Sequence, residues 1–356
     1  MITSDLRRIV TIPVADQPKT EYLFSIYGTP IRYTTSSSLL AAPVEELLRH
    51  FRRNSLDESV PLTLSFQAVQ DRAEIPPILS PAARHLCSGT GIPVGGRPED
   101  ELPYTVSQDC GRLIVDFRDA GRFVIDGAHG SAEGYLIKPQ RMPPSLIEYL
   151  FHLALIELLR RRELYTIHAT ALEMHGLGVL IPGNSGRGKT TSFISLLRSG
   201  YRYLSDDHPL IRDAGTHVEL FPFPIKINVT EDTIAFFPEL RNAPGHVLQR
   251  QPGFHKRGFY AEELYRTEIG ACCRPALVLF PQVVDAPRSY LEPLPKSRAM
   301  ELLLPQALLV YDAEVARREF QVLAKVVQQV DCYRLHFGRD VLDLPKLITP
   351  LLEEMH

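Results

Sequence analysis

The alternation of apolar and polar positions predicts a first region built mainly from short strands. Glycine, Asp-Ala-Gly and proline turns separate the strand-like runs, which is typical of antiparallel pairing. Residues 71–101 break this pattern, being proline-rich and poorly periodic, and the choice between a long surface loop and a lid stays open. Strands are predicted at 22–28, 31–35, 62–66, 113–117, 123–125 and 134–137, and a helix at about 43–52.

The clearest helix lies at 144–162, where apolar residues recur at spacings of three and four. Pro144 suits its first turn, and three arginines at 160–162 follow at its end. We interpret these arginines as a solvated last turn rather than a nucleic-acid patch. Further strands are predicted at 218–227, 275–284, 290–294 and 331–338, and helices at 296–304, 312–328 and 341–351.

An apolar strand at 179–182 leads into the sequence GNSGRGKT, and a helix is predicted to begin at Lys189. The match to G-x-x-x-x-G-K-[ST] therefore has the strand, loop and helix that a phosphate-binding loop requires. Glycines let successive backbone N–H groups face phosphate oxygens, and the helix adds its positive end. An ordinary glycine-rich turn is the alternative. The candidate nucleotide-binding residues are Gly183, Asn184, Ser185, Gly186, Arg187, Gly188, Lys189, Thr190 and Thr191.

An acidic pair follows the loop closely. Between Lys189 and the pair Asp206-Asp207 there is room for only one short helix and one strand. The next strand therefore returns both carboxylates to the phosphate end, where one can hold Mg²⁺ and the other can accept a proton. A turn or helix cap is the alternative role of such a pair.

A hairpin is predicted to lead into the loop. Residues 166–174 are strand-like, and the turn residues at 175–178 precede the strand before the loop. The sheet around the loop is therefore expected to be mixed or antiparallel. In this arrangement His168 lies on the adjacent strand, near the phosphates, although a structural histidine is the simpler interpretation.

Two further cationic features follow in the chain. The segment 238–262 looks like a loop and contains Arg241, His246, Arg250, His255, Lys256 and Arg257. Such a loop either faces the substrate or is merely solvated. Arg266, on a predicted strand, is a candidate for stabilising phosphoryl charge, and an ion pair with Glu268 or Glu263 is the alternative.

Composition narrows the class of protein. The chain has 356 residues, 44% hydrophobic and 23% charged, as in ordinary soluble globular proteins. A net charge of −3 provides no general attraction for nucleic acid or membrane. Five cysteines without framework spacing, and no signal-like or membrane-spanning run, lead us to expect a cytoplasmic protein.

The segment 168–210, beginning HATALEMHGLGVLIPGNSGRGKT, resembles the catalytic core of the HPr kinase/phosphorylase family, whose fold is shared with phosphoenolpyruvate carboxykinase. It resembles more closely the HPr-kinase-related proteins of bacterial peptide-tailoring gene sets, some of which phosphorylate a serine of a lasso-peptide precursor. The resemblance implies that the loop and Lys189 bind ATP, that Thr190 and Asp206 serve Mg²⁺, that Asp207 is the general base and that His168 assists at the phosphates.

The sequence departs from that family further along. The family's motif E-[IL]-R-G-[LV]-G is expected in the segment 221–240, where this chain has FPFPIKINVTEDTIAFFPEL. Glu231 stands near the expected offset from the acidic pair, but the Arg-Gly is missing. This difference argues against HPr as the acceptor and against the reverse phosphorolysis.

Together these features predict a mixed α/β protein with a phosphoenolpyruvate carboxykinase-like core at 141–356 and a small α+β domain at 1–140. The expected function is that of an ATP- and Mg²⁺-dependent kinase acting on a serine or threonine hydroxyl of a peptide or small protein, such as a lasso-peptide precursor. A nucleotide-dependent switch protein and a small-molecule kinase are the alternatives. Neither nucleic acid nor membrane is an expected partner, and the oligomeric state is open.

Overall fold

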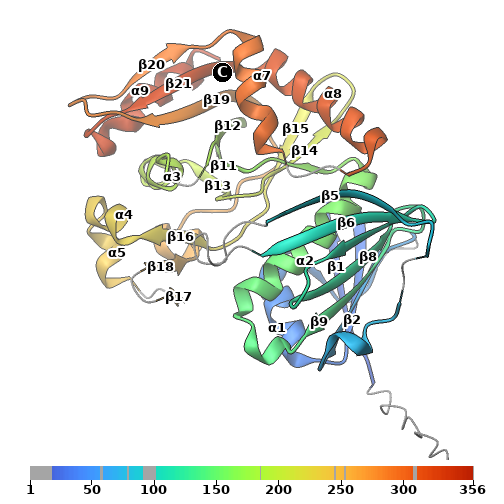
Figure 1. Cartoon of the computed structure of the whole chain (residues 1–356). Helices are drawn as coiled ribbons and strands as arrows, with labels where there is room; N and C mark the ends of the chain where they lie inside the picture. Colours follow the sequence, from blue (N-terminus) through green and yellow to red (C-terminus); the bar gives the residue numbers. More distant parts are fainter. Residues whose placement is uncertain are drawn as a thin grey trace, which may run out of the picture.

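The computed structural model describes residues 18–56, 59–77, 80–90, 102–184, 186–243, 246–251, 254–307 and 311–355. Within these ranges the strands form sheets of nine, six, three and three strands. Figure 1 shows the six-stranded sheet at the top and the nine-stranded sheet at the lower right. The predicted mixed α/β architecture is therefore confirmed. None of the described helices has the length and apolar character needed to span a bilayer.

The nine-stranded sheet has the order β3-β1-β2-β4-β9-β8-β7-β6-β5. Six of its eight pairings are antiparallel, as predicted, and β4 pairs in parallel with both β2 and β9. Alternate residues of β4 are buried, which is typical of a sheet with one covered face. The strands are β1 (Thr20–Ile26), β2 (Thr29–Thr35), β3 (Arg52–Arg53), β4 (Leu62–Val69), β5 (Arg84–Thr90), β6 (Pro103–Asp109), β7 (Arg112–Asp116), β8 (Gly121–Asp126) and β9 (Ser131–Ile137).

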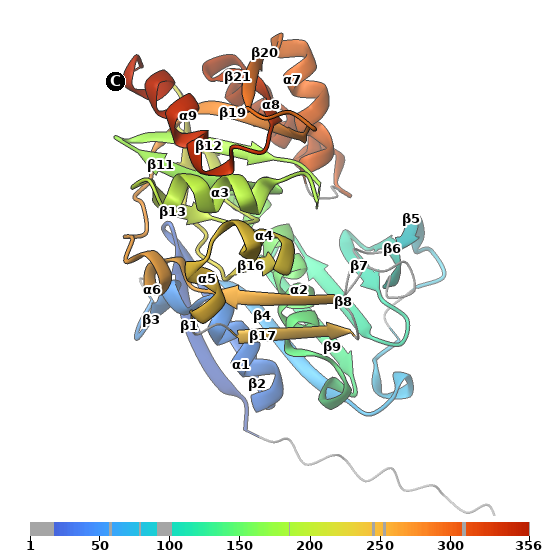
Figure 2. The ribbon, with the colours of Figure 1, turned by 90° about the vertical axis from the view of Figure 1, so that its left-hand side faces the viewer.

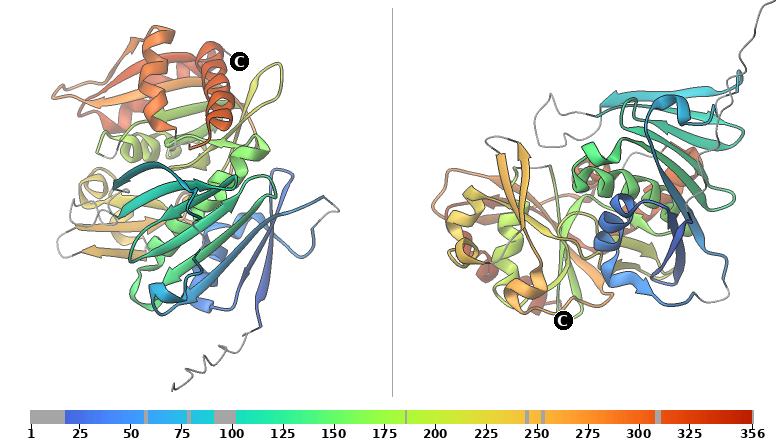
Figure 3. Two further views of the ribbon diagram at one scale, coloured as in Figure 1. Left: turned by 45° about the vertical axis from the view of Figure 1, so that its right-hand side comes forward. Right: turned by 90° about the horizontal axis from the view of Figure 1, so that it is seen from below.

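Helices α1 (Ser38–Leu47) and α2 (Pro144–Leu159) cover this sheet. Figures 2 and 3 show the green helix α2 beside the teal strands. In the core, Phe151 of α2 lies 5.5 Å from Phe66 of β4, measured between ring centroids. Helix α1 begins ahead of the predicted start, because Leu40 and Ala41 are also buried against the sheet. The division at 140 remains a prediction, and α2 packs with the strands that precede it.

The six-stranded sheet carries the phosphate-loop sequence and has the order β13-β11-β12-β19-β21-β20. Strands β11 and β12 form the predicted antiparallel hairpin, whereas β12, β19 and β21 run parallel. Most residues of β11, β12 and β19 are buried, because helices cover both faces of the sheet. The strands are β11 (Ala169–Met174), β12 (Leu177–Pro182), β13 (Arg202–Ser205), β19 (Arg274–Val283), β20 (Tyr290–Pro293) and β21 (Asp331–Phe337).

One face of this sheet packs on α3 (Lys189–Leu197) and α9 (Leu344–Glu353), and the other on α7 (Lys296–Leu303) and α8 (Ala313–Gln329). Helix α8 buries Val315, Val322 and Val326, at the spacing of one apolar stripe. The C-terminal helices and strands thus lie close to the predictions, and α3 begins at the predicted residue. The C-terminus lies with this unit (Figure 1).

Two small sheets complete the fold. One contains β10 (Tyr165–Thr166), β14 (Leu210–Asp213) and β15 (Val218–Phe221), and the other β16 (Ile227–Thr230), β17 (His246–Gln251) and β18 (Phe254–Phe259). Short helices α4 (Glu231–Phe236), α5 (Glu239–Asn242) and α6 (Ala261–Tyr265) accompany the second sheet. The prediction of a loop at 238–262 was therefore wrong, because the segment contains helix α5, the β17–β18 hairpin and the start of α6. Likewise β5 occupies part of 71–101, of which 78–79 and 91–101 lie outside the described residues.

The arginines at 160–162 correct a second prediction. They form a 3₁₀ turn, but Arg160 is fully buried rather than solvated. Its Nη1 lies 3.0 Å from Glu157 Oε1, and its Nη2 lies 3.5 Å from Glu319 Oε1 on α8. A buried guanidinium needs such carboxylate partners, because an unpaired charge would be strongly destabilising. Arg160 thereby connects the helix of the nine-stranded sheet to α8.

Candidate functional site

Strand register brings the predicted site residues to one edge of the six-stranded sheet. Ala169 of β11 pairs with Pro182 of β12, so His168 lies opposite the start of the phosphate loop. Ala171 pairs with Ser205 of β13, so the two aspartates that follow Ser205 arrive at the same edge. The backbone N–H of Ala169 donates to the carbonyl of Asp207 over 3.0 Å, which fixes the second aspartate there.

The loop has the backbone that its glycines predict. Gly183, Gly186 and Gly188 all have positive φ, between 80° and 150°. At Gly188, the N-cap of α3, a Cβ would also lie 3.1 Å from the ring of Phe337. Positive φ and close packing both favour glycine. The loop therefore turns tightly into the N-terminus of α3, where backbone N–H groups lack partners within the helix.

Lys189, His168 and Asp207 form one polar cluster. His168 Nε2 lies 3.0 Å from Lys189 Nζ and 2.9 Å from Asp207 Oδ1. Lys189 Nζ also donates to the carbonyl oxygen of Gly183. Burial lowers the pKa of Lys189, although Asp207 and Asp206 partly offset this effect. The lysine that opens α3 is thus directed back over the loop and toward the acidic pair.

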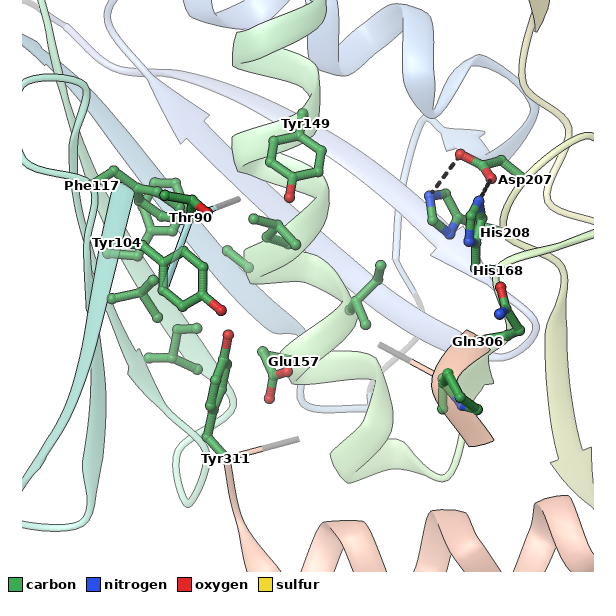
Figure 4. Close-up of a pocket in the computed structure, with 18 residues that line it drawn as sticks. Thr90, Tyr104, Phe117, Tyr149, Glu157, His168, Asp207, His208, Gln306 and Tyr311 are labelled. Carbon is green, nitrogen blue, oxygen red and sulfur yellow. Dashed lines mark ion pairs between the residues drawn. The ribbon is translucent and has the colours of Figure 1, made fainter. Parts of the chain in front are cut away.

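The Nε2 atom of His168 faces two different partners. A protonated Nε2 donates to Asp207, whereas an unprotonated Nε2 accepts from Lys189, so one nitrogen cannot serve both at once. Asp207 has a second partner, His208, whose Nε2 lies 3.3 Å from Oδ2 (Figure 4). Partial burial raises the pKa of Asp207, but His208 and His168 outweigh this effect and hold the pKa well below its usual value. With 42% of its side chain exposed, Asp207 is an ionised acceptor within reach of a ligand.

Asp206 has a different environment from Asp207. It is only 8% exposed, and Thr170 Oγ1 lies 3.4 Å from its Oδ1. The backbone N–H of Asn228 donates to Oδ2 over 3.4 Å. Burial, followed by the charge of Asp207, raises the pKa of Asp206 to about 7. Two adjacent carboxyls thus have pKa values shifted in opposite directions, a pattern of functional sites.

Asp206→Asn is expected to change how stability depends on pH, without nucleotide and Mg²⁺. A carboxyl whose pKa is raised on folding keeps a proton that the unfolded chain releases, so stability falls as the pH rises to about 7 and is level above. Asparagine does not titrate. Between pH 5 and 8 the wild type should lose on the order of 2–3 kcal/mol of unfolding free energy relative to the variant, measured by urea denaturation. Parallel stability curves would contradict the raised pKa.

The structure does not bring every predicted residue into this cluster. Thr191 Oγ1 lies 3.2 Å from Thr233 Oγ1 of α4, and Ser185 lies outside the described residues. Arg266 was predicted to lie on a strand, and this prediction was wrong. Arg266 ends α6 with φ 49°, and its side chain is exposed. No contact among the described residues joins Arg266 to Lys189, so its role stays a prediction.

The basic residues of 241–257 do not all belong to the site. Lys256 of β18 lies close enough to lower the pKa of both Lys189 and Asp206 by its charge. Arg257 instead donates to the carbonyls of Arg241 and Ala243 and so stabilises the local chain. The side chains of His246, Arg250 and His255 lie outside the described residues. Lys256 is therefore the member of this run that the structure associates with the site.

Two residues of the site were missed from the sequence. His208 follows the acidic pair directly, and this adjacency was a usable signal. Its ring lies 4.7 Å from that of buried His152, measured between centroids. Gln306, far downstream in the chain, donates from Nε2 to Asn184 Oδ1 of the loop over 3.4 Å, and its backbone carbonyl oxygen accepts from the backbone N–H of His168. Nothing in the sequence around Gln306 indicated this contact.

Comparison with curated proteins finds short similarities. An HPr kinase/phosphorylase of Pediococcus pentosaceus is 46% identical over 48 residues, which are 14% of this chain and 15% of that protein. The corresponding protein of Lactobacillus johnsonii is 45% identical over 42 residues, or 12% of this chain and 13% of the relative. That of Caldanaerobacter subterraneus is 40% identical over 50 residues, or 14% and 16%. The match thus spans about a seventh of the relatives' length.

The chain was also compared with protein-family models and with solved structures. No family model matches the chain. A solved structure, the Hpr(Ser) kinase/phosphatase from Coxiella burnetii, aligns with 53% of this chain and 95% of its own, with 13% identity and a TM-score of 0.26. The predicted similarity to HPr kinase/phosphorylases is therefore confirmed at the level of sequence for a segment of 42–50 residues.

Proposed function

We propose that this protein is an ATP- and Mg²⁺-dependent kinase that transfers the γ-phosphoryl group to a serine or threonine hydroxyl. The proposal depends on one observation. His168 Nε2 lies between Lys189, at the start of α3, and the ionised carboxylate of Asp207, 3.0 Å from Lys189 Nζ and 2.9 Å from Asp207 Oδ1. Lys189, the candidate phosphate-binding lysine, and Asp207, the candidate base, therefore lie close together, as phosphoryl transfer to a hydroxyl requires.

The residues of the loop suit a nucleotide. Gly183, Gly186 and Gly188 have positive φ, and the ring of Phe337 leaves little room for a Cβ at Gly188. The backbone at these glycines can therefore approach phosphates closely at the N-terminus of α3. The amides of 183–188 and Lys189 would hold the phosphates, and Thr190 and Asp206 would hold Mg²⁺. When bound, ATP would supply the transferable phosphoryl group and Mg²⁺ would offset its charge. Among the described residues no cluster of three His, Cys, Asp or Glu could hold a metal, and Mg²⁺ bound through phosphates needs none.

Four side chains of the site would either position and deprotonate the acceptor hydroxyl or offset negative charge on the phosphates. Asp207 would orient the attacking hydroxyl and accept its proton as the new bond to phosphorus forms. Its low pKa keeps it ionised at neutral pH but makes it a weak base, so orientation is the larger part of its role. His168 and His208 hold the two carboxylate oxygens in position, one each. Lys189 offsets the negative charge that develops between the loop and the acidic pair. Positioning and charge stabilisation would supply most of the acceleration.

A peptide or small protein is the proposed acceptor, and a lasso-peptide precursor is the specific candidate. The resemblance of 168–210 to kinases of peptide-tailoring gene sets supports this class, and the lack of an Arg-Gly within 221–240 argues against HPr itself as the acceptor. The phosphoenolpyruvate carboxykinase-like identity of the core, and its division from the segment 1–140, belong to the same proposal. If peptides are not modified, the alternatives are a kinase of a small-molecule hydroxyl and a nucleotide-dependent switch protein.

Intact-mass spectrometry of candidate peptides, incubated with the protein, ATP and Mg²⁺, tests the proposal. We expect each accepted peptide to gain the mass of one phosphate, which fragmentation should place on a serine or threonine. Reactions without nucleotide or with EDTA provide the controls. Tight nucleotide binding in calorimetry, with no transfer to any peptide or small hydroxyl compound, would favour the switch and contradict the kinase.

A further inference from the structure

A cavity of about 270 Å³ opens beside the catalytic cluster. Its walls come from three distant parts of the chain, which are strands of the nine-stranded sheet, helix α2 and the segment that contains 305–307 and 311 (Figure 4). Phe117, Phe123 and Ile125 form the sheet wall, and Leu153 and Ala154 form the helix wall. This volume is slightly below the range of about 300–1,000 Å³ for small-molecule sites, so it suits one large side chain or a compact molecule.

One end of this cavity is the proposed active site. His168, Asp207, His208 and Gln306 line that end, and Figure 4 shows them grouped on the side opposite Tyr104 and Phe117. A hydroxyl placed at Asp207 would therefore have its neighbouring group directed between the sheet and α2. The cavity thus extends from the reacting position toward the aromatic and aliphatic side chains of the sheet and α2, with the hydroxyls of Tyr104, Tyr149 and Tyr311 among them.

Gln306 supplies independent evidence for a ligand here. It is only 7% exposed, and its Nε2 is used by Asn184 of the loop. Its Oε1 is buried and has no hydrogen-bond partner among the described residues. A buried acceptor without a partner is unfavourable unless something else donates to it. An amide N–H beside an acceptor hydroxyl would satisfy Oε1 at the mouth of the cavity.

The charges around the cavity limit what can enter. No lysine or arginine occurs among its described lining residues, and its carboxylates are Asp207 and Glu157. Glu157 is already paired with Arg160 and Arg161, at 3.0 and 3.4 Å. An anionic group would have no cationic partner inside, and burying it without one is costly. The walls therefore disfavour an anionic group, and Phe117, Phe123 and Leu153 offer apolar contacts to a large uncharged side chain, whose edge the hydroxyls of Tyr104, Tyr149 and Tyr311 could contact.

The geometry points to an acceptor site for a serine or threonine whose neighbouring residue carries a large apolar or aromatic side chain. That side chain occupies the cavity while the hydroxyl lies at Asp207 and the adjoining amide donates to Gln306 Oε1. This inference rests on the proposed kinase function. A compact aryl alcohol shares the same chemistry, so the experiment includes one.

The first experiment uses a library of peptides with one central serine and randomised neighbours, incubated with the full chain, γ-³²P-labelled ATP and Mg²⁺. Matched peptides with phenylalanine or glycine beside the serine are then compared, together with 2-phenylethanol. We expect kcat/KM about tenfold or more higher for the phenylalanine peptide, because its side chain leaves water. If 2-phenylethanol is phosphorylated efficiently and the peptides are not, the acceptor is a small alcohol rather than a peptide. No transfer to the library or to 2-phenylethanol would refute the kinase, whereas modification of peptides without apolar preference would refute only the cavity's role.

A second experiment fills the cavity. Ala307 lines it and is partly exposed, so Ala307→Phe is expected to fold. The variant should raise KM for the phenylalanine peptide about tenfold, while the glycine peptide and ATP keep their KM within twofold. Ala316→Phe, on α8, is partly exposed but not in the cavity and should behave as wild type. An unchanged preference in Ala307→Phe would overturn the inference.

A variant with the opposite effect protects this test against misfolding. Leu153→Ala enlarges the cavity from the α2 side, and circular dichroism checks that the helix content of each variant is retained. We expect Leu153→Ala to shift the preferred neighbour from phenylalanine toward tryptophan, by about fivefold in relative kcat/KM. If neither variant changes the preference, the neighbouring side chain binds elsewhere.

Discussion

Replacing Asp207 with asparagine should lower the rate of phosphoryl transfer by about 10²–10⁴-fold, the usual contribution of a general base. Asparagine retains the size of the side chain but has no carboxylate to accept the acceptor's proton. Nucleotide affinity should stay within about threefold, because the loop amides and Lys189 remain. Single-turnover transfer of ³²P to the best peptide from the library, with calorimetry of ATP binding, measures both quantities.

Asp285→Asn provides the matched control, since Asp285 is a highly exposed surface carboxylate in the described part of the chain. It should leave both quantities unchanged. An Asp207→Asn protein that transfers phosphate at the wild-type rate would remove the proposed base. A protein that binds ATP and peptide but transfers nothing even as wild type would support the switch function.

Replacing Arg160 with methionine should reduce the free energy of unfolding by about 3–5 kcal/mol near pH 8. Arg160 is fully buried and contacts Glu157 and Glu319, so methionine would leave two buried carboxylates without this cation. The loss should be smaller at pH 5. Burial raises the pKa of Glu319 to about 7 even beside Arg160, so protonation would relieve this carboxylate in acid.

Urea denaturation at both pH values measures the effect. Arg298→Met removes an exposed ion pair with Glu301 and should change stability by less than about 1 kcal/mol. Adding Glu319→Gln to Arg160→Met should recover part of the loss at pH 8. Equal losses for the two arginine variants would show that the buried cluster contributes little to stability.

The sequence predicted the site best where contacts are local in the chain. Residues 168–207 contain the hairpin, the loop, α3 and β13. Strand register places His168 and Asp207 at one edge, and the short loop that follows β12 brings Lys189, the first residue of α3, to the same edge. Glycine positions and apolar runs specify these turns directly. The roles of these residues remain predictions, because geometry brings them together without showing the reaction.

Contacts between distant segments were not predictable in the same way. Strand β4 pairs in parallel between β2 and β9, and no local pattern specifies such a neighbour. Arg160 looked solvated because its partner Glu319 lies on α8, in a distant part of the sequence. Gln306 and the cavity walls likewise depend on tertiary packing. Arg266 was misplaced because a short helical turn with a left-handed end resembles a strand in pattern.

Helix α2 has a consequence for how such a protein could be divided or recombined. Its Phe151 packs among the aromatic side chains of the first sheet, and its Leu153 lines the cavity. Arg160, just beyond its end, is tied to α8. A cut at residue 140 would separate the strands from α2, one of their two covering helices, and a cut after α2 would remove a wall of the proposed acceptor site. Exchange of the N-terminal segment between homologues would therefore alter acceptor choice and folding together.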